Sequence, residues 1–362
     1  ELLQMKTTRR KFFGTATGGA ALMLASFGLA ARARVGARGV QARAVQGQSR
    51  PVPALNAGDK VAIVAPASPS GDAEKAAQWL RAHGFSAEIM PSAMEKLAPP
   101  FDYLAGTDSA RVDDIHYAFL SSDIKAVWCL RGGFGATRLL DKLDYALIGA
   151  NPKPFIGYSD ITALHLALQK YAGLVTFHGP MLASDLVQEK LPPTASLILD
   201  LLSGRLPSGS LILPPPMYPV ATLVDGTAQG RLVGGNLSLL CSTLGTPYEV
   251  DSTDAILFLE DTEIALPRLD RLLTQLRLAG KLRSIRGLLL GRFVIAGETP
   301  AATPSSMANA LFNEFFLPLK IPVMVNWSSG HVDPNLALPL GATVSLDTAQ
   351  GAIRLLSQAV VQ

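Results

Sequence analysis

Cysteine and charge are both scarce in this chain of 362 residues. It has 2 cysteines, and 17% of its residues are charged. Neither cysteine belongs to a C-x-x-C pair, and no cluster of histidine and cysteine has the spacing of a metal site. Cys129 lies in the apolar run AVWCL and Cys241 in the helical pattern LSLLCSTL, so we expect both to be buried free thiols. The sequence gives no sign of a structural metal or a disulfide framework.

Two nucleotide-binding motifs are missing as well. The segment LRGGFGATRLL lacks the Lys-Ser/Thr of a P-loop, and its G-G-x-G spacing is not the G-x-G-x-x-G dinucleotide fingerprint. These differences argue against a nucleotide-binding Rossmann protein. No internal repeat or low-complexity block follows residue 44. A hydrophobic content of 48% over this length predicts a globular chain with two cores.

Basic residues are concentrated near the N-terminus. Residues 1–50 hold nine of the 32 Lys and Arg residues and one of the 29 Asp and Glu residues. The rest of the chain therefore has 23 basic and 28 acidic residues, a net charge of −5. Because nucleic-acid binding depends on clustered positive charge, we expect no nucleic-acid partner.

Residues 1–44 are predicted to be an export leader. A basic start with Arg9 and Arg10 precedes the apolar run GTATGGAALMLASFGLAA, which is too glycine-rich, and too basic downstream, for a membrane span. The segment resembles a twin-arginine leader, so we expect a periplasmic protein with no stable span after leader removal. Cleavage after Ala33 or after Ala44 fits the small-residue rule. The alternative is an uncleaved amphipathic or disordered tail.

The rest of the chain is predicted to be α/β. Apolar strand patterns alternate with amphipathic helices over residues 52–185, which is typical of a doubly wound, mainly parallel sheet. Residues 186–222 are rich in proline and serine and are interpreted as a linker. Residues 223–362 combine glycine turns, strands and helices, and are predicted to form a smaller, β-rich C-terminal domain carrying helices.

One serine lies where a buried strand changes into a helix. In the stretch PFIGYSDITALHLALQK, residues 154–170, the change falls at GYSD. Such a turn exposes the hydroxyl of Ser159. The backbone amide of Asp160 lies at the helix N-terminus, where a negative charge is favoured. Position 161 is isoleucine, so the segment departs from the G-x-S-x-G pattern. Ser159 is a candidate nucleophile; helix capping by Ser159 or Asp160 is the alternative.

The segment RGGFG also follows a predicted strand. Its small residues expose backbone amides that are suited to binding a phosphate or an oxyanion. Since carboxyl ends of parallel strands share one edge of a sheet, RGGFG and GYSD are predicted to lie at the same edge. A purely structural turn is the alternative interpretation.

A nucleophilic serine needs a base and an acid that orients it. His178, in TFHGPM, ends a predicted strand, and His331 lies in the polar, glycine-flanked loop NWSSGHVDPNLALPLGA; the other three histidines lie in or next to predicted helices. The strand ILFLEDTE offers Glu260, Asp261 and Glu263 as acids. From the residues alone, each candidate remains open, because strand-end hydrogen bonds and solvated charges are common.

Several segments, in this order, resemble the LD-carboxypeptidase family of serine peptidases. They are RGGFGATRLLDKLDY, PFIGYSDITALH, TFHGPM, GRLVGGNLSLLCSTLGTPYE, ILFLEDTEIALPRLDRLLTQLRLAG and GHVDPNLALPLGA. The resemblance covers about residues 55–355. The family includes muramoyl-tetrapeptide carboxypeptidases and microcin C self-immunity peptidases.

The resemblance implies a Ser-His-Glu triad made of Ser159, His331 and Glu260. It implies an oxyanion hole formed by the amides of Asp160 and Gly133, at the interface of the two predicted domains. It further implies a murein peptide substrate, cleaved between an L-centre and a terminal D-amino acid. No metal or organic cofactor is implied, and the protein is expected to be a homodimer. Many relatives are cytoplasmic recycling enzymes, and the export leader departs from that pattern.

Two other functions remain as alternatives. The same triad would suit an immunity-type peptidase or amidase that acts on a peptide-nucleotide or another acylated substrate. A non-catalytic muropeptide-binding protein is the other possibility. The presence of all three triad candidates argues against it, because a binding protein need not keep them.

Overall fold

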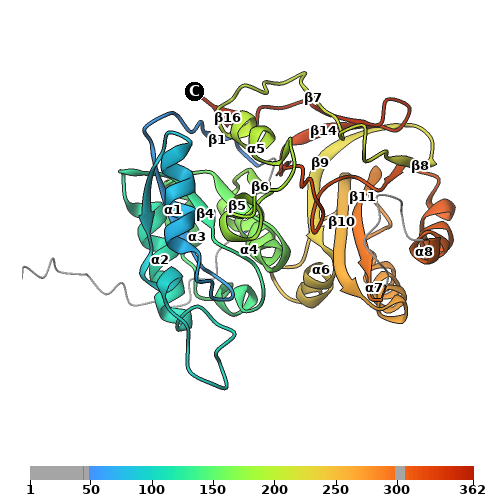
Figure 1. Ribbon diagram of the computed structural model, residues 1–362. Helices are drawn as coiled ribbons and strands as arrows, with labels where there is room; N and C mark the ends of the chain where they lie inside the picture. The colour runs from blue at the N-terminus through green and yellow to red at the C-terminus, as the bar shows by residue number, and fades with distance from the viewer. Residues whose placement is uncertain (1–43, 45–48, 298–305) are drawn as a thin grey trace, which may run out of the picture. The chain divides into compact units, whose positions relative to one another are not determined.

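The computed structural model describes residues 44, 49–297 and 306–362. The predicted export leader lies outside the described residues, apart from Ala44. All described residues belong to one compact unit, residues 37–362. Figure 1 shows a sheet coloured blue to green, built mainly from the first half of the chain, and a second sheet coloured yellow to red.

The first sheet has six strands in the order β13-β6-β5-β4-β2-β3. Their bounds are β2 Lys60–Val64, β3 Ser86–Ile89, β4 Ile124–Cys129, β5 Phe155–Gly157, β6 Thr176–His178 and β13 Leu338–Leu340. Strands β2 to β6 are parallel, and β13 runs antiparallel to β6. The order of β2 to β6 is the 2-1-3-4-5 order of a doubly wound sheet. The expected α/β class is therefore confirmed.

Helices alternate with these strands, as the sequence predicts. They are α1 Ala73–Ala82, α2 Asp108–Leu120, α3 Tyr145–Ala150 and α4 Thr162–Ala167. α1 ends next to His83, and Gly84, with φ +86°, supplies the left-handed residue after it. The segment GATRLLDKL, after β4, forms only a 3₁₀ turn, Ala136–Leu139. A new helix, α3, follows with Asp144 as its N-cap, whose side chain accepts from Leu147 N at 2.9 Å.

The second sheet has eight strands in the order β7-β15-β14-β9-β10-β11-β12-β8. Their bounds are β7 Leu211–Ile212, β8 Ala221–Val224, β9 Thr227–Asn236, β10 Ala255–Ile264, β11 Gly287–Ile295, β12 Val323–Val325, β14 Thr343–Asp347 and β15 Ala352–Leu355. The central strands β9 to β12 are parallel, and the flanking strands are antiparallel. The helices that follow its strands are α6 Leu237–Thr243, α7 Leu266–Leu278 and α8 Ser306–Phe316.

The two halves of the chain are joined at several points. β13 comes from the second half and extends the first sheet, and β1, Val52–Pro53, pairs with β16, Val360–Val361. One cluster of buried hydrophobic residues continues from the first sheet to Phe258 and Trp327 of the second half. The segment 186–222, interpreted as a linker, contains helix α5, Thr194–Leu202, and β7. The domain boundaries themselves stay a prediction.

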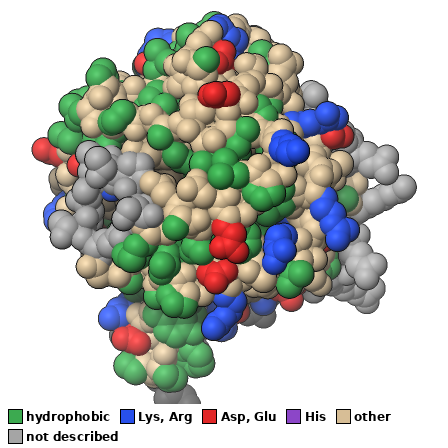
Figure 2. Space-filling model, turned by 90° about the vertical axis from the view of Figure 1, so that its right-hand side faces the viewer, with side chains coloured by type: hydrophobic (Ala, Val, Ile, Leu, Met, Phe, Trp, Pro, Cys, Tyr) green, Lys and Arg blue, Asp and Glu red, His purple; other side chains and the backbone are tan. Residues whose placement is uncertain are grey.

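Figure 2 presents the side of the molecule that carries α7 and α8. Side chains of both charges are interspersed there with hydrophobic ones, so the face has no continuous stripe of one charge. Cys129 and Cys241 are buried and unpaired, as predicted. In the part of the chain that the structure describes, no helix is both long enough and apolar enough to cross a membrane.

Candidate active site

Ser159 occupies the sharp strand-to-helix turn that the sequence predicts. β5 ends at Gly157, and the 3₁₀ turn Ser159–Ile161 leads directly into α4. Ser159 has φ +63°, in the left-handed region that non-glycine residues rarely adopt, and such strain is concentrated at functional sites. A Cβ on Gly157 would lie 3.0 Å from Ile161 and 3.1 Å from Cys129, so glycine permits the close packing of the turn.

The structure brings the side chains of Ser159, His331 and Glu260 together. His331 Nε2 lies 3.1 Å from Ser159 Oγ, and His331 Nδ1 lies 2.8 Å from Glu260 Oε2. With the proton on Nδ1, the imidazole donates to Glu260 and accepts from the Ser159 hydroxyl. The Glu260 side chain is fully buried, whereas that of His331 is 21% exposed. The chain thus forms a serine-histidine-carboxylate array with its histidine accessible from solvent.

The register of β10 and the close approach of Gly330 fix Glu260 next to the imidazole of His331. β9 and β10 pair as far as Glu260, opposite Asn236, and the register with β11 shifts between Leu259 and Asp261. Glu260 therefore lies within β10, which continues to Ile264. Gly330, at φ +102°, packs its α-carbon against the Glu260 carboxylate, where any side chain would collide.

Electrostatics favours a charged Glu260 and a readily protonated His331. Burial raises the pKa of the Glu260 carboxyl, but His331, which faces it and donates to it, together with the other donors around it, outweighs burial and lowers that pKa below its ordinary value. Burial lowers the pKa of His331, but the charge of Glu260, its hydrogen bond and the other nearby carboxylates together outweigh burial and raise that pKa. Both shifts suit an imidazole that takes a proton from Ser159 while a carboxylate stabilises the resulting charge.

The turn after β4 faces Ser159. A Cβ on Gly132 would lie 3.1 Å from Ser159 Oγ, so Gly132 is the residue of RGGFG that approaches the serine, a detail that sequence reasoning missed. The N–H of Gly133 makes no hydrogen bond with any described residue, and Phe134 N donates to Ser68 Oγ at 3.0 Å. The Gly133 amide is thus free for another acceptor; its role in an oxyanion hole stays a prediction.

Asp160 joins the two turns. Its side chain is 4% exposed and accepts a 2.8 Å hydrogen bond from Ala136 N, just beyond RGGFG. Burial raises the pKa of this carboxyl to about 6, against the opposing effects of the Ala136 amide and Arg111. The side chain therefore braces the turn, while its backbone amide remains the candidate oxyanion donor.

The other sequence candidates lie nearby without joining the array. His178 is fully buried between the rings of Tyr158 and Phe258, at centroid distances of 5.7 and 4.8 Å, and burial lowers its pKa to about 3. Asp261 accepts hydrogen bonds from Ser238, and Glu263 is exposed. Among the three acids, only Glu260 contacts His331 within the described residues.

In residues 49–297 and 306–362, no group of three or more His, Cys, Asp or Glu side chains is arranged to hold a metal ion.

Comparison with known families agrees with the α/β fold. Residues 61–179 match the model described as the LD-carboxypeptidase N-terminal domain, and residues 229–346 match the LD-carboxypeptidase C-terminal domain. The first match contains Ser159, and the second contains Glu260 and His331.

Individual relatives give the same picture. A probable murein peptide carboxypeptidase of Bacillus subtilis is 38% identical over 300 residues, which cover 82% of this chain and 91% of that protein. The solved muramoyltetrapeptide carboxypeptidase of Oxalobacter formigenes matches with a TM-score of 0.66 and 30% identity, covering 82% of this chain and 97% of that one. The structure of MccF in complex with glutamyl sulfamoyl guanosine matches with a TM-score of 0.75 and 25% identity, covering 86% and 99%.

The fold and the site thus define a serine peptidase of the α/β class. More specifically, the chain belongs to the LD-carboxypeptidase family and is a serine-type LD-carboxypeptidase.

Proposed function

We propose that this enzyme releases the terminal D-alanine from murein tetrapeptides, by cleaving the bond that joins it to the preceding L-centre. The observation that carries the proposal is the contact of His331 with both Ser159 and Glu260, in a chain of this family. The names of the relatives from Bacillus subtilis and Oxalobacter formigenes support a murein peptide as the substrate class. The proposed process is peptidoglycan turnover.

The proposed chemistry has two halves. Ser159 Oγ attacks the carbonyl carbon while its proton passes to His331 Nε2, and Glu260 stabilises the imidazolium. The amides of Gly133 and Asp160 bind the oxyanion, an interaction of the type whose loss costs about 10²–10³ in turnover. The tetrahedral intermediate collapses, and the leaving D-alanine takes the proton from His331. Water then attacks the acyl-enzyme, gives its proton to His331 and releases the tripeptide with regeneration of Ser159.

Arg131 is the candidate for recognising the free carboxylate of the leaving residue. It directly precedes Gly132, whose α-carbon lies against Ser159. Its side chain is exposed, its nearest hydrogen-bond acceptor is Pro69 O at 3.5 Å, and it forms no ion pair with the described carboxylates. Guanidinium groups bind carboxylates through paired hydrogen bonds. An exposed arginine directly before the glycine that approaches the nucleophile supports the removal of one terminal residue rather than internal cleavage.

Mass spectrometry of a muropeptide digest tests the proposal. Incubation with the purified protein is expected to convert tetrapeptide stems to tripeptide stems with release of free D-alanine. Intact tetrapeptides after prolonged incubation contradict the proposed substrate. The Ser159→Ala variant serves as the control for contaminating peptidases.

A second candidate function is that of an immunity-type peptidase acting on a peptide-nucleotide. It is favoured by the higher structural similarity to MccF, with a TM-score of 0.75 against 0.66 for the muramoyltetrapeptide carboxypeptidase. Incubation with aminoacyl sulfamoyl nucleosides separates the two. Faster hydrolysis of these compounds than of tetrapeptides favours the second function.

The compartment and the oligomeric state belong to the proposal as well. The paired Arg9 and Arg10 and the apolar run after them support export through the twin-arginine pathway, which would bring the enzyme to the periplasm with released muropeptides or the sacculus.

A homodimer is proposed because the family resemblance implies it. Sedimentation velocity of the purified protein tests it, since a monomer at micromolar concentration contradicts the expectation.

A further inference from the structure

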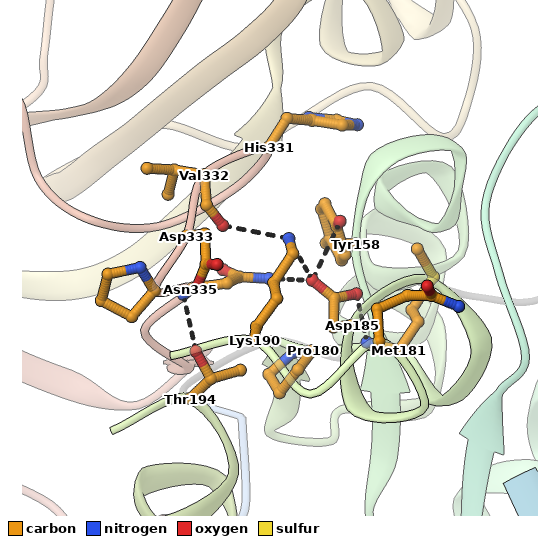
Figure 3. A network of polar contacts seen from close by, with 12 residues as sticks. Tyr158, Pro180, Met181, Asp185, Lys190, Thr194, His331, Val332, Asp333 and Asn335 are labelled. Carbon is orange, nitrogen blue, oxygen red and sulfur yellow. Dashed lines mark hydrogen bonds and ion pairs between the residues drawn. The ribbon is translucent and has the colours of Figure 1, made fainter. Parts of the chain in front are cut away.

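The loop that carries His331 is attached to a buried polar network outside the catalytic array. At its centre lies Asp185, fully buried in the helical turn Leu182–Leu186 (Figure 3). One oxygen, Oδ1, accepts from Tyr158 Oη at 3.2 Å and from Asn335 Nδ2 at 3.3 Å, and lies 2.6 Å from Lys190 Nζ. The other oxygen accepts from Met181 N at 3.0 Å. A buried carboxylate with this many donors is strongly fixed in place.

Two partners of Asp185 hold the backbone on either side of His331. Lys190 Nζ donates to Val332 O at 3.0 Å, directly after the histidine. Asn335 Oδ1 accepts from Gly330 N at 2.9 Å, directly before it. Figure 3 shows Asn335, from the histidine loop, and Lys190, from the segment that carries Asp185, converging on Asp185.

The network also reaches the imidazole and the nucleophile. The ring of Tyr158, which precedes Ser159 in the chain, meets the ring of His331 edge-on at a centroid distance of 4.9 Å. Its hydroxyl donates to the same oxygen of Asp185 that receives Lys190 and Asn335. One carboxylate oxygen therefore links the nucleophile turn with the histidine loop.

The same segment of the chain holds the rest of the loop. Leu191 N donates to Asp333 Oδ1 at 2.7 Å, and Asn335 N donates to Thr194 Oγ1 at 3.0 Å. Between β12 and β13 the loop has no regular secondary structure, so its position depends on such contacts. Lys190, Leu191 and Thr194, which make these contacts, lie 141 or 142 positions before their partners in the chain.

We propose that Asp185 and Lys190 are positioning residues, whose ion pair fixes the backbone around His331 and so keeps Nε2 within reach of Ser159. The inference rests on the proposed function, in which His331 is the general base. A buried ion pair adds little net stability compared with apolar residues, so its value lies in geometry. Misplacement of a catalytic group by about 1 Å costs about 10²-fold in rate.

Four variants of the full chain test the inference. Lys190→Met removes the ammonium, and Lys190→Arg keeps a cation. The double variant Asp185→Asn, Lys190→Met removes both charges, so that no uncompensated carboxylate is left to unfold the protein. Lys170→Met is the matched control, because Lys170 Nζ also donates to a backbone carbonyl distant in sequence, Pro247 O at 2.6 Å, away from the network.

The first readout is hydrogen exchange of the Gly330 amide, which needs no substrate. We expect exchange about tenfold or more faster in Lys190→Met and in the double variant, because Val332 O loses the donor that holds the loop next to Gly330. Lys190→Arg and Lys170→Met are expected to exchange at the parent rate. Equal exchange at Gly330 in Lys190→Met, the double variant and Lys170→Met overturns the inference.

The second readout is the kinetics of D-alanine release. Lys190→Met and the double variant are expected to lose about 10–10²-fold in kcat with KM changed less than about twofold, and Lys190→Arg to regain most of that loss. A rise in KM at constant kcat overturns the inference, since Lys190 then binds substrate. If the parent releases no D-alanine, the proposed function fails, while the exchange comparison still decides how the loop is held.

Discussion

The Glu260→Gln substitution tests the role of the acid. Glu260 Oε2 accepts the Nδ1 proton of His331 at 2.8 Å inside a fully buried site. A glutamine of the same shape has no charge, and its NH₂ group turned toward Nδ1 selects the tautomer that carries its proton on Nε2. In that tautomer the imidazole cannot accept the Ser159 proton. We expect a loss in kcat of about 10³–10⁴-fold, equal to about 4–5.5 kcal/mol of transition-state stabilisation.

The pH dependence of kcat/KM provides an independent test of the same role. Glu260 raises the pKa of His331, and the base must be neutral to act, so the parent enzyme loses kcat/KM as pH falls through that raised pKa. Without the carboxylate, the pKa of His331 falls, and the acidic limb of the residual activity is expected to move to lower pH.

The assay is D-alanine release from purified tetrapeptide, coupled to a D-amino acid oxidase, between pH 5 and pH 9. Glu263→Gln is the control, because Glu263 is an exposed carboxylate of the same strand. Activity of Glu260→Gln within tenfold of the parent, or an acidic limb that moves to higher pH, refutes the reasoning.

Three further predictions concern the turn after β4 and the N-terminus. Gly132→Ala adds a methyl group 2.9 Å from Ser159 Cβ and 3.1 Å from the proposed nucleophile oxygen, so Ser159 must shift, and kcat is expected to fall at least about 10²-fold. Gly71→Ala, where a Cβ meets no atom within 4 Å, is the control, and equal activity of the two contradicts the geometry. Arg131→Gln is expected to raise KM for tetrapeptide about tenfold or more and to leave a C-terminally amidated analogue unaffected, whereas equal effects on both peptides argue against carboxylate recognition. Replacing Arg9 and Arg10 with lysine is expected to block export, measured by cell fractionation, and unchanged periplasmic recovery contradicts the twin-arginine route.

Most of the first sheet could be predicted from local sequence. Strands such as Lys60–Val64 and Ile124–Cys129 are almost continuously apolar because parallel strands in this sheet are buried on both faces. The addition of Leu338–Leu340 to the same sheet could not be predicted, because its partner strand, β6, lies far away in the sequence. A strand of three residues is also too short to show a recognisable hydrophobic pattern. Long-range pairing is decided by packing, not by local propensity.

The array of Ser159, His331 and Glu260 was predictable for a different reason. Ser159 follows a predicted strand, Glu260 lies in one and His331 lies in a glycine-flanked loop, and the motifs around them identify the family. Asp185 and Lys190 give no such signal, because charges close to proline- and serine-rich sequence are usually solvated. Only the folded chain shows that Asp185 is fully buried and paired with Lys190.

The choice between two adjacent glycines could not be made from sequence either. Gly132 and Gly133 have the same local context, and the sequence favours neither as the residue that faces the serine. The fold separates them: Gly132 approaches Ser159, and Gly133, at φ +113°, packs its α-carbon against Ser68. Their difference is one of backbone geometry, which side-chain chemistry does not encode.

The central claim is that the hydroxyl of Ser159 performs the attack on the scissile carbonyl. Its most direct test is the rate of D-alanine release by Ser159→Ala from purified tetrapeptide, with circular dichroism to verify the fold. The account predicts a folded protein whose kcat is lower by about 10⁶-fold, the scale seen when a serine peptidase loses its nucleophile. A folded Ser159→Ala variant that releases D-alanine at the parent rate contradicts it.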